Sequence, residues 1–289
     1  MSLVKDLLNR HEASTHQKLL KAAGEHGAAV YPKIRLADVL PVEHSGIDDV
    51  LFQFALQAHF DFVVAEGVTP VFAVEFDGPT HLDQGQKARD RKKFALCQLF
   101  EFPLLRITAR YLPTVYRGYD LLSWCVEQWF LSRAFDAAQA RGDIPPDESF
   151  DPMMIVAGSG RPHPFPMWLS VEPRSAIRRL AENGHCRDAV PSLWIGVAED
   201  RSYRGIMWLR LGESRWAITE SSARAQLFPV DPPQLLGEIM AFELLQRVET
   251  SQKQRRFGVD ERVLRKSLER YATKYKMVMA CSLGGAGAV

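Results

Sequence analysis

The spacing of hydrophobic and polar residues predicts alternating helices and strands in the first part of the chain. Apolar residues recur at helical spacing over 2–26, and the β-favouring segment 28–40 is interrupted by Pro32. Two β-rich runs, Phe60–Val64 and Val71–Phe76, are separated by a short turn containing Gly and Pro, which is typical of a hairpin. We therefore expect a helix, a broken strand and a two-stranded ribbon.

The segment after the hairpin predicts a return to helical structure. A polar stretch favours a helix from near Asp83, residues 103–107 favour a short buried strand, and residues 111–141 favour a long helix. Residues 44–57 are consistent with either a short helix or a strand. The resulting order of elements indicates an α/β layered domain with helices on a mixed sheet.

The composition changes near residue 142, where a polar, Pro-rich connector begins. Such connectors separate domains, so we expect a first domain over 1–142 and a smaller α+β domain over 150–289. In the second domain, short turns separate three strand candidates, which favours an antiparallel meander. The predicted elements are strands over 193–198, 205–211 and 216–219, and closing helices over 232–252 and 259–277.

Composition and charge narrow the class of protein. The 289 residues are 46% hydrophobic and 25% charged, as in ordinary globular proteins, and the net charge of +1 argues against polyanion binding over the whole surface. No apolar run approaches the roughly 18 residues of a membrane span, and the N-terminus lacks the apolar segment of a signal peptide. We expect a cytoplasmic protein with no membrane contact. The four cysteines form no closely spaced pair, so we expect buried, reduced thiols and no zinc site.

Two acidic residues interrupt the apolar hairpin. Asp61 and Glu75 are equally distant from Val68, so a turn centred there would place them opposite each other on the two strands. Directly opposed residues have β-carbons about 4.5–5.5 Å apart, and two half-buried carboxylates at that distance repel unless a cation lies between them. Asp77 points to the same face if the second strand extends that far, so three acids could converge on one point.

Two interpretations of these acids are open. Mg²⁺ prefers oxygen ligands from one or two carboxylates, completed by water and phosphate oxygens, so Asp61, Glu75 and Asp77 are candidate ligands of Mg²⁺ or Mn²⁺. Alternatively, acids at strand ends simply face water or pair with arginine, which is a common arrangement. The hairpin pattern alone favours neither interpretation.

The ordered motifs around the hairpin resemble the domain-of-unknown-function 2726 family, a branch of the PD-(D/E)XK nuclease-like superfamily. The resemblance covers about residues 5–110 and rests on the order of several short segments. These segments are Glu12 in the first helix, residues 30–40, Asp61-Phe62-Val63-Val64, Glu75-Phe76-Asp77, His81, the Asp90-x-x-Lys93 helix and Pro103-Leu104-Leu105-Arg106. The family implies a restriction-endonuclease-like mixed sheet flanked by helices.

The resemblance also implies a metal-dependent phosphodiesterase core. Asp61 and Glu75 correspond to the metal-binding acids of the superfamily, and Glu12 corresponds to the helix acid beside the metal. The superfamily usually has a lysine two residues after its second acid, where this chain has Asp77. The resemblance implies that Lys93 of the next helix takes that place, where it would offset the negative charge that grows on phosphate oxygens.

Other polar residues near these motifs have two interpretations each. His81 could orient an attacking water or contact a phosphate, or it could cap its own loop. The basic residues Lys87, Arg89, Arg91 and Lys92 either form the solvated face of their helix or bind a nucleic-acid backbone.

The C-terminal region is strongly basic. Residues 245–277 contain ten Lys and Arg against four acids, so this segment carries a charge of +6. It predicts a basic helical hairpin in which Arg255, Arg256 and Lys266 contact phosphate, or one whose basic residues only keep it soluble. The Gly-Ser-Gly at 158–160 lacks the features of a phosphate loop or dinucleotide motif, so we expect no nucleotide cofactor.

These observations support three functional hypotheses. The first is a Mg²⁺- or Mn²⁺-dependent nuclease that cuts DNA in preference to RNA. Domains of this type occur together with phage-defence and DNA-repair proteins, which suggests one of these two settings. The second is a non-catalytic module of the same fold that binds nucleic acid or a protein partner. The third is a scaffold whose C-terminal half docks on a larger complex. Many relatives of this core act as dimers, so a homodimer is compatible with the nuclease hypothesis.

Overall fold

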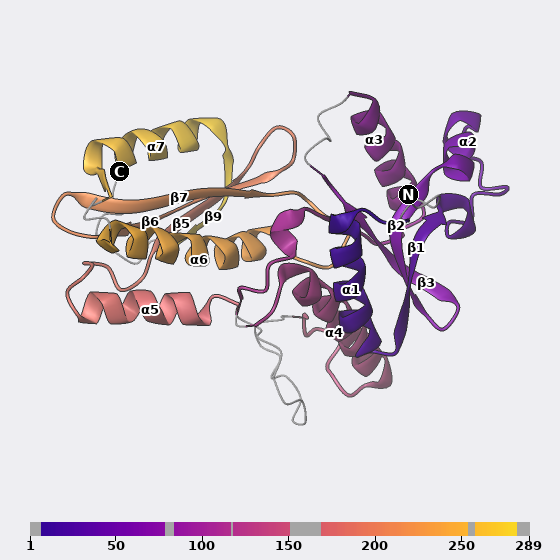
Figure 1. Ribbon diagram of the computed structural model, residues 1–289, viewed down its shortest axis with the longest axis horizontal. Helices are drawn as coiled ribbons and strands as arrows, with labels where there is room; N and C mark the ends of the chain where they lie inside the picture. Colours follow the sequence, from indigo (N-terminus) through magenta and orange to yellow (C-terminus); the bar gives the residue numbers. More distant parts are fainter. Residues whose placement is uncertain (1–6, 79–83, 117, 151–168, 254–257, 282–289) are drawn as a thin grey trace, which may run out of the picture. The chain divides into compact units, whose positions relative to one another are not determined.

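The computed structural model describes residues 7–78, 84–116, 118–150, 169–253 and 258–281 (Figure 1). The chain divides into two compact units, Met1–Ile155 with Gln226–Val230 and Val156–Ala225 with Asp231–Val289. Each unit contains its own β-sheet. Within the described residues, no helix is both long enough and apolar enough to span a membrane.

The first unit is built on a mixed four-stranded sheet in the order β1-β2-β3-β4. β1 pairs antiparallel with β2 and β2 with β3, whereas β3 and β4 run parallel. The strands span Ala28–Arg35 (β1), His59–Glu66 (β2), Thr69–Phe76 (β3) and Leu104–Ile107 (β4). The expected mixed sheet is confirmed, and the hairpin forms its two central strands.

The helices of this unit lie on both faces of the sheet. On one face, His16 of α1 stacks on Phe62 and Trp129 of α4 packs against Phe72. On the other face, α2 and α3 contribute to a buried cluster that includes Leu96 of α3 and Val63 of β2. The helices span Arg10–Gly24 (α1), Asp49–Gln57 (α2), Gln84–Leu99 (α3) and Leu121–Arg141 (α4), with short 3₁₀ turns at Leu36–Asp38 and Ala109–Tyr111.

Two predicted helix starts are wrong, and in both cases a capping side chain explains the true boundary. α1 begins at Arg10 because the Asn9 side chain accepts hydrogen bonds from the first backbone N–H groups. α4 begins at Leu121 rather than near residue 111 because the Asp120 carboxylate caps it. The ambiguous segment 44–57 contains helix α2. Pro32 is tolerated within β1 because β1 is an edge strand of the sheet.

The hairpin register follows from a tight turn and a compensating bulge. Glu66 pairs with Thr69, and Gly67 adopts a left-handed φ of 61° in the turn between them. The register shifts by one residue between Val64 and Ala65, so Phe62 pairs with Val74. The strands therefore arrive at the alignment that a turn centred on Val68 predicts.

A later segment of the chain completes the first unit. Leu227 forms an antiparallel bridge with Leu104 of β4, and Gln226 hydrogen-bonds both backbone polar groups of Arg106. Phe228 stacks against Trp129 at a ring separation of 5.5 Å. The segment Gln226–Val230 thus covers the outer edge of β4, which would otherwise present unpaired backbone groups.

The second unit is an antiparallel five-stranded sheet in the order β8-β7-β6-β5-β9. The strands span Ser192–Val197 (β5), Tyr203–Arg210 (β6), Arg215–Ala223 (β7), Val259–Asp260 (β8) and Lys276–Cys281 (β9). The helices span Val171–Glu182 (α5), Pro232–Lys253 (α6) and Glu261–Lys274 (α7). The predicted meander is confirmed as β5, β6 and β7, whereas α5 was not expected from the sequence.

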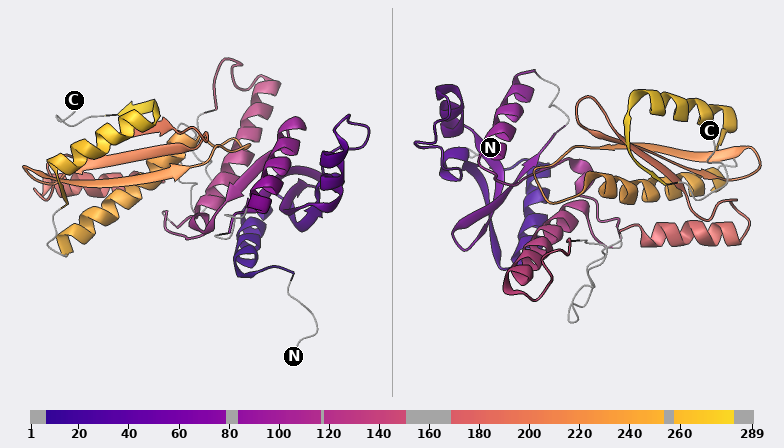
Figure 2. Two further views of the ribbon diagram at one scale, coloured as in Figure 1. Left: turned by 90° about the horizontal axis from the view of Figure 1, so that it is seen from above. Right: turned by 180° about the vertical axis from the view of Figure 1, so that it is seen from behind.

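The predicted C-terminal helical hairpin is wrong. Leu236 and Met240 of α6 pack in a cluster on one side of the sheet, whereas Leu264 and Tyr271 of α7 pack in another cluster with Trp208. Figure 2 shows α6 and α7 on opposite faces of this sheet. The chain also leaves the helical conformation after Lys274 and adds β9 beside β5.

The cysteines differ in one respect from the expectation of buried thiols. Cys97, Cys125 and Cys186 are buried and reduced, whereas Cys281 at the end of the edge strand β9 is exposed. Burial raises the pKa of the Cys97 thiol to about 12, so this thiol stays protonated near neutral pH.

Candidate functional site

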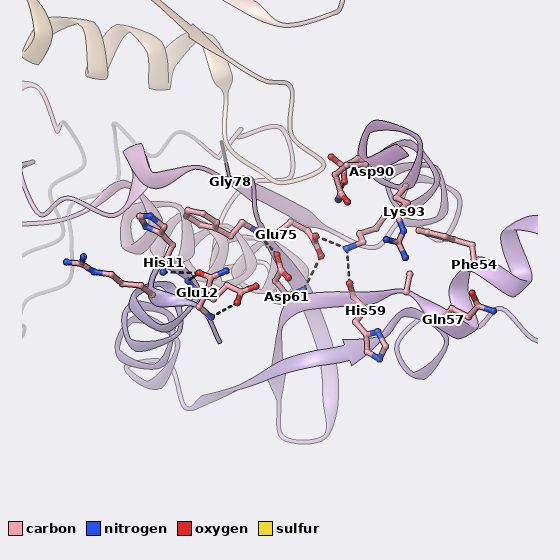
Figure 3. Close-up of a pocket in the computed structure, with 16 residues that line it drawn as sticks. His11, Glu12, Phe54, Gln57, His59, Asp61, Glu75, Gly78, Asp90 and Lys93 are labelled. Carbon is pink, nitrogen blue, oxygen red and sulfur yellow. Dashed lines mark hydrogen bonds and ion pairs between the residues drawn. The ribbon is translucent and has the colours of Figure 1, made fainter. Parts of the chain in front are cut away.

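A pocket of about 730 Å³ opens in the first unit, where the N-terminal end of α1 and one side of α3 approach β2 and β3. Figure 3 shows the lining side chains, among which Glu12, Asp61, Glu75 and Lys93 come from four different elements. The pocket therefore contains both acids of the hairpin, and its walls are mainly polar.

The two hairpin acids bind each other's strands. The backbone N–H of Asp61 donates to Glu75 Oε1 at 3.1 Å, and the backbone N–H of Phe76 donates to Asp61 Oδ2 at 2.9 Å. These contacts follow the last backbone pair of β2 and β3, Phe62 with Val74, so the carboxylates are held close together by the sheet itself. The predicted opposition of Asp61 and Glu75 is confirmed.

Lys93 of α3 supplies a positive charge at the second acid. Its Nζ lies 2.7 Å from Glu75 Oε2 and donates to the carbonyl of His59 at 2.8 Å. Both side chains are largely buried, with 14% of Lys93 and 12% of Glu75 exposed. The structure therefore directs the lysine amine of the following helix into the pocket (Figure 3).

The Glu12 carboxylate makes one contact at the start of its own helix and another with a lysine of β1. Its Oε2 accepts from the backbone N–H of Asn9, which completes a capping box at the start of α1. Its Oε1 lies 2.5 Å from the Nζ of Lys33, and the same ammonium lies 2.6 Å from Asp61 Oδ1. The first helix thus brings a third carboxylate to the hairpin acids.

Lys33 was not identified from the sequence. It lies between Pro32 and Ile34, which pair with Phe62 and Phe60, so the register places it across from Asp61. Its φ of 56° is unusual for a residue with a side chain. Because its partners Glu12 and Asp61 are far away in the sequence, no local pattern signals the contact.

Burial strongly perturbs Glu75. It raises the pKa of this carboxyl from 4.5 to about 7; the Lys93 ammonium lowers it, and the neighbouring Asp61 carboxylate raises it. A carboxyl that titrates near neutral pH beside another acid is a recurrent feature of functional sites. A cation near the pair would favour the ionised form of Glu75.

Asp77 does not converge with the other acids. Its Oδ1 lies 2.5 Å from the guanidinium of Arg106, which also contacts Asp90 Oδ2 of α3 at 2.6 Å. Asp77 is therefore part of a buried bridge that ties β3 and β4 to α3. Among the described residues, no three His, Cys, Asp or Glu side chains form a ready-made metal-binding group.

The basic residues of α3 differ in their position relative to the pocket. Lys87, Arg91 and Lys92 do not line the pocket, whereas Arg89 of the same helix and Arg10 of α1 do. Gln86, Arg89, Asp90 and Lys93 follow the spacing i, i+3, i+4, i+7, so they share one face of α3. Helical spacing counted from Lys93 therefore separates Arg89 from the other basic residues of this helix and places it on the pocket side.

The remaining predicted contacts divide into two groups. His81, Arg255 and Arg256 lie outside the described residues. Lys266 is exposed on α7 of the second unit. Tyr271 of α7, by contrast, is buried in that unit and donates its hydroxyl to the carbonyl of Arg204.

The donor set suits a hard cation. Oxygens of Glu12 and Asp61 both contact one ammonium, that of Lys33, so two carboxylates from separate elements already converge on a positive charge. Carboxylate oxygens are the ligands that Mg²⁺ and Mn²⁺ favour, and one or two of them are sufficient where water and phosphate complete the shell. Among the described residues, Glu12 and Asp61 are the acids whose oxygens converge in this way, while Glu75 lies beside Asp61 and contacts Lys93.

The site thus belongs to an α/β domain with a polar pocket of paired acidic and basic side chains beside its central hairpin. Residues 4–117 match the model of a family described as "Protein of unknown function (DUF2726)", which confirms the family resemblance for this segment. Searches of curated proteins and of solved structures returned no match.

Proposed function

We propose that the first unit is a metal-dependent nuclease of the PD-(D/E)XK type that hydrolyses phosphodiester bonds, in DNA rather than RNA. The observation that carries this proposal is the pairing of Asp61 with Glu75 on adjacent strands, with the Lys93 amine 2.7 Å from Glu75. Two acids and a lysine on a central hairpin and its following helix are what the family resemblance implies for such a site.

The arrangement of elements supports the same proposal. The order helix, strand, short helix, hairpin, helix and parallel strand gives a mixed sheet with helices on both faces, and a restriction-endonuclease-like core has the same kind of sheet. The acids lie at the end of the central hairpin, and α1 brings Glu12 to them from outside the sheet. The superfamily assignment therefore rests on both element order and the position of the acids.

In the proposed mechanism, the acids and the basic residues of the pocket have different roles. Asp61 and Glu75, with Glu12 beside them, would hold Mg²⁺ or Mn²⁺. Such an ion, when bound, polarises a phosphate and generates a nucleophilic water. The Lys93 ammonium would stabilise negative charge on the phosphoryl oxygens. Arg89 and Arg10, which line the pocket, would position the phosphate backbone without reading its sequence.

Cleavage of supercoiled and linear DNA by purified variants tests the proposal. The wild type should cut with Mg²⁺ or Mn²⁺ and not with EDTA, and Glu75→Gln and Lys93→Met should each lower the rate by about 100-fold or more. Glu66→Gln is the matched control, because Glu66 is exposed on the same strand as Asp61. Equal rates for the wild type and Glu75→Gln would overturn the proposal, since the activity would then come from a contaminant.

A second candidate is a non-catalytic module of the same fold that binds nucleic acid. One observation favours it: the superfamily's usual lysine position is occupied by Asp77, which is committed to Arg106. This candidate predicts metal-independent retention of DNA in a gel-shift assay, with no cleavage by the wild type. Loss of retention on Arg89→Ala, without any cleavage in the wild type, would favour it over the nuclease.

A further inference from the structure

The ammonium of Lys33 lies between the carboxylates of Glu12 and Asp61, which come from different elements. Its Nζ lies 2.5 Å from Glu12 Oε1 on α1 and 2.6 Å from Asp61 Oδ1 on β2. An ammonium bound by two carboxylate oxygens at such short distances fills the place that a small cation would take. Lys33 therefore competes with any ion that uses these oxygens.

The backbone of Lys33 indicates that this position is imposed rather than accidental. Lys33 has a φ of 56°, whereas its neighbours Pro32 and Ile34 pair with β2 in an ordinary antiparallel register. A left-handed conformation is unfavourable for a residue with a side chain, and such outliers persist where the surroundings enforce them. In the structure, the side chain of this residue makes two ion pairs, with Glu12 and Asp61.

Charge balance shows what an exchange of cations would do. With all acids ionised, Glu12, Asp61 and Glu75 carry three negative charges, and Lys33 and Lys93 carry two positive ones. The group keeps one net negative charge. If a divalent ion replaced the Lys33 ammonium, the same group would become neutral, which is the favourable state for a partly buried cluster.

The exposed fractions of the three side chains show that Lys33, and not Glu12 or Asp61, is able to leave this contact. The Lys33 side chain is 39% exposed, whereas Glu12 is 13% and Asp61 is 18% exposed. A flexible lysine stem can carry its ammonium into water at little cost. The acids stay in place because the capping box fixes Glu12 and the Phe76 backbone N–H fixes Asp61.

We propose that Lys33 is a positioning residue that acts as a built-in cation: its ammonium holds Glu12 and Asp61 together in the metal-free protein and is displaced by the divalent ion. This inference rests on the proposed metal-dependent function and adds a residue that the family resemblance did not identify. It predicts two opposite effects of removing the ammonium, a loss of metal-free stability and a gain in metal affinity.

Isothermal titration calorimetry of the full chain with Mn²⁺ tests the inference. Lys33→Met should bind Mn²⁺ roughly 5- to 30-fold more tightly than the wild type, a difference of about 1–2 kcal/mol in binding free energy. Lys33→Arg, which keeps the charge, should bind like the wild type. Lys21→Met is the matched control, because Lys21 is exposed on α1 away from the pocket lining.

Thermal unfolding supplies a second readout that does not depend on catalysis. In EDTA, Lys33→Met should melt below the wild type, and saturating Mn²⁺ should remove most of that difference. Lys33→Gln provides the same comparison if the methionine variant does not fold, and circular dichroism verifies the fold of each variant. A merely structural lysine would give the lower melting temperature without the gain in Mn²⁺ affinity.

The outcomes separate this inference from the proposed function. If the wild type binds Mn²⁺ and Lys33→Met binds it equally or more weakly, the role of Lys33 is overturned and the metal-dependent function stands. If neither protein binds Mn²⁺, both are overturned. Tighter binding by Lys33→Met, with unchanged binding by Lys33→Arg and Lys21→Met, supports the inference.

Discussion

Asp61 and Glu75 each accept a hydrogen bond from the other's strand, Asp61 from the N–H of Phe76 and Glu75 from the N–H of Asp61 itself. These contacts follow the last backbone pair of β2 and β3. Their second oxygens face the ammoniums of Lys33 and Lys93. This reciprocal arrangement fixes two like charges close together and makes the pocket sensitive to any added cation.

The raised pKa of Glu75 predicts a pH-dependent stability. Between pH 4.5 and about 7 the folded protein holds a proton on Glu75 that the unfolded chain has lost, so this group's contribution to stability falls as pH rises through that window. Glu75→Gln removes the titration. In EDTA, the unfolding free energy of the variant relative to the wild type should rise by about 1–3 kcal/mol between pH 5 and pH 8, measured by urea denaturation. An unchanged difference at the two pH values would contradict the assignment.

Lys93 and Glu75 are predicted to be energetically coupled. Removing the Lys93 ammonium leaves a buried carboxylate without its cation, so Lys93→Met should lower stability at pH 8 by about 2–4 kcal/mol. The loss should be smaller when Glu75 is already glutamine. A double-mutant cycle measured by chemical denaturation should give a coupling energy of at least about 1 kcal/mol, and additive effects would show that the ion pair contributes nothing.

Asp77 should affect stability rather than metal binding. Its partner Arg106 also contacts Asp90, so Asp77→Asn weakens a buried bridge between β3 and α3. We expect a loss of about 1–3 kcal/mol in unfolding free energy. The Mn²⁺ affinity measured by calorimetry should stay within about twofold of the wild type, a difference below ~0.5 kcal/mol. A tenfold weaker affinity would identify Asp77 as a ligand after all.

The cysteines give a simple check of the burial pattern. Cys281 is exposed, whereas Cys97, Cys125 and Cys186 are buried. A colorimetric thiol reagent should therefore modify Cys281 rapidly in the native protein and the other three only after denaturation, as peptide mass spectrometry can verify. Rapid native labelling of Cys97 would contradict the packing of α3 against the sheet.

Much of the first unit could be predicted because its signals are local. The alternation in the hairpin and the equal distance of Asp61 and Glu75 from the turn were sufficient to place both acids opposite each other. The predicted opposition is correct because the bulge at Val64 and Ala65 offsets the two-residue turn. The sequence did not reveal this bulge. The position of Lys93 followed from the family resemblance.

The features that could not be predicted from the sequence involve contacts between distant parts of the chain. Lys33 and Arg106 meet their acidic partners only in the folded state, so neither the ammonium at Asp61 nor the bridge to Asp77 could be inferred from spacing. Lys276–Cys281 contains Met and Ala, which favour helix, and pairing with β5 overrides that preference. The predicted helical hairpin is also wrong because of contacts between distant segments. The sheet lies between α6 and α7, so the two helices do not pack against each other.

Anomalous diffraction from Mn²⁺-soaked crystals of the full chain is the most direct measurement of the metal site. The proposal predicts one peak in the pocket, within ligand distance of Glu12 and Asp61 oxygens and beside Glu75, with the Lys33 ammonium moved away from Glu12. No peak there at Mn²⁺ concentrations that saturate calorimetric binding, or a peak elsewhere with Lys33 still joining Glu12 to Asp61, would contradict it.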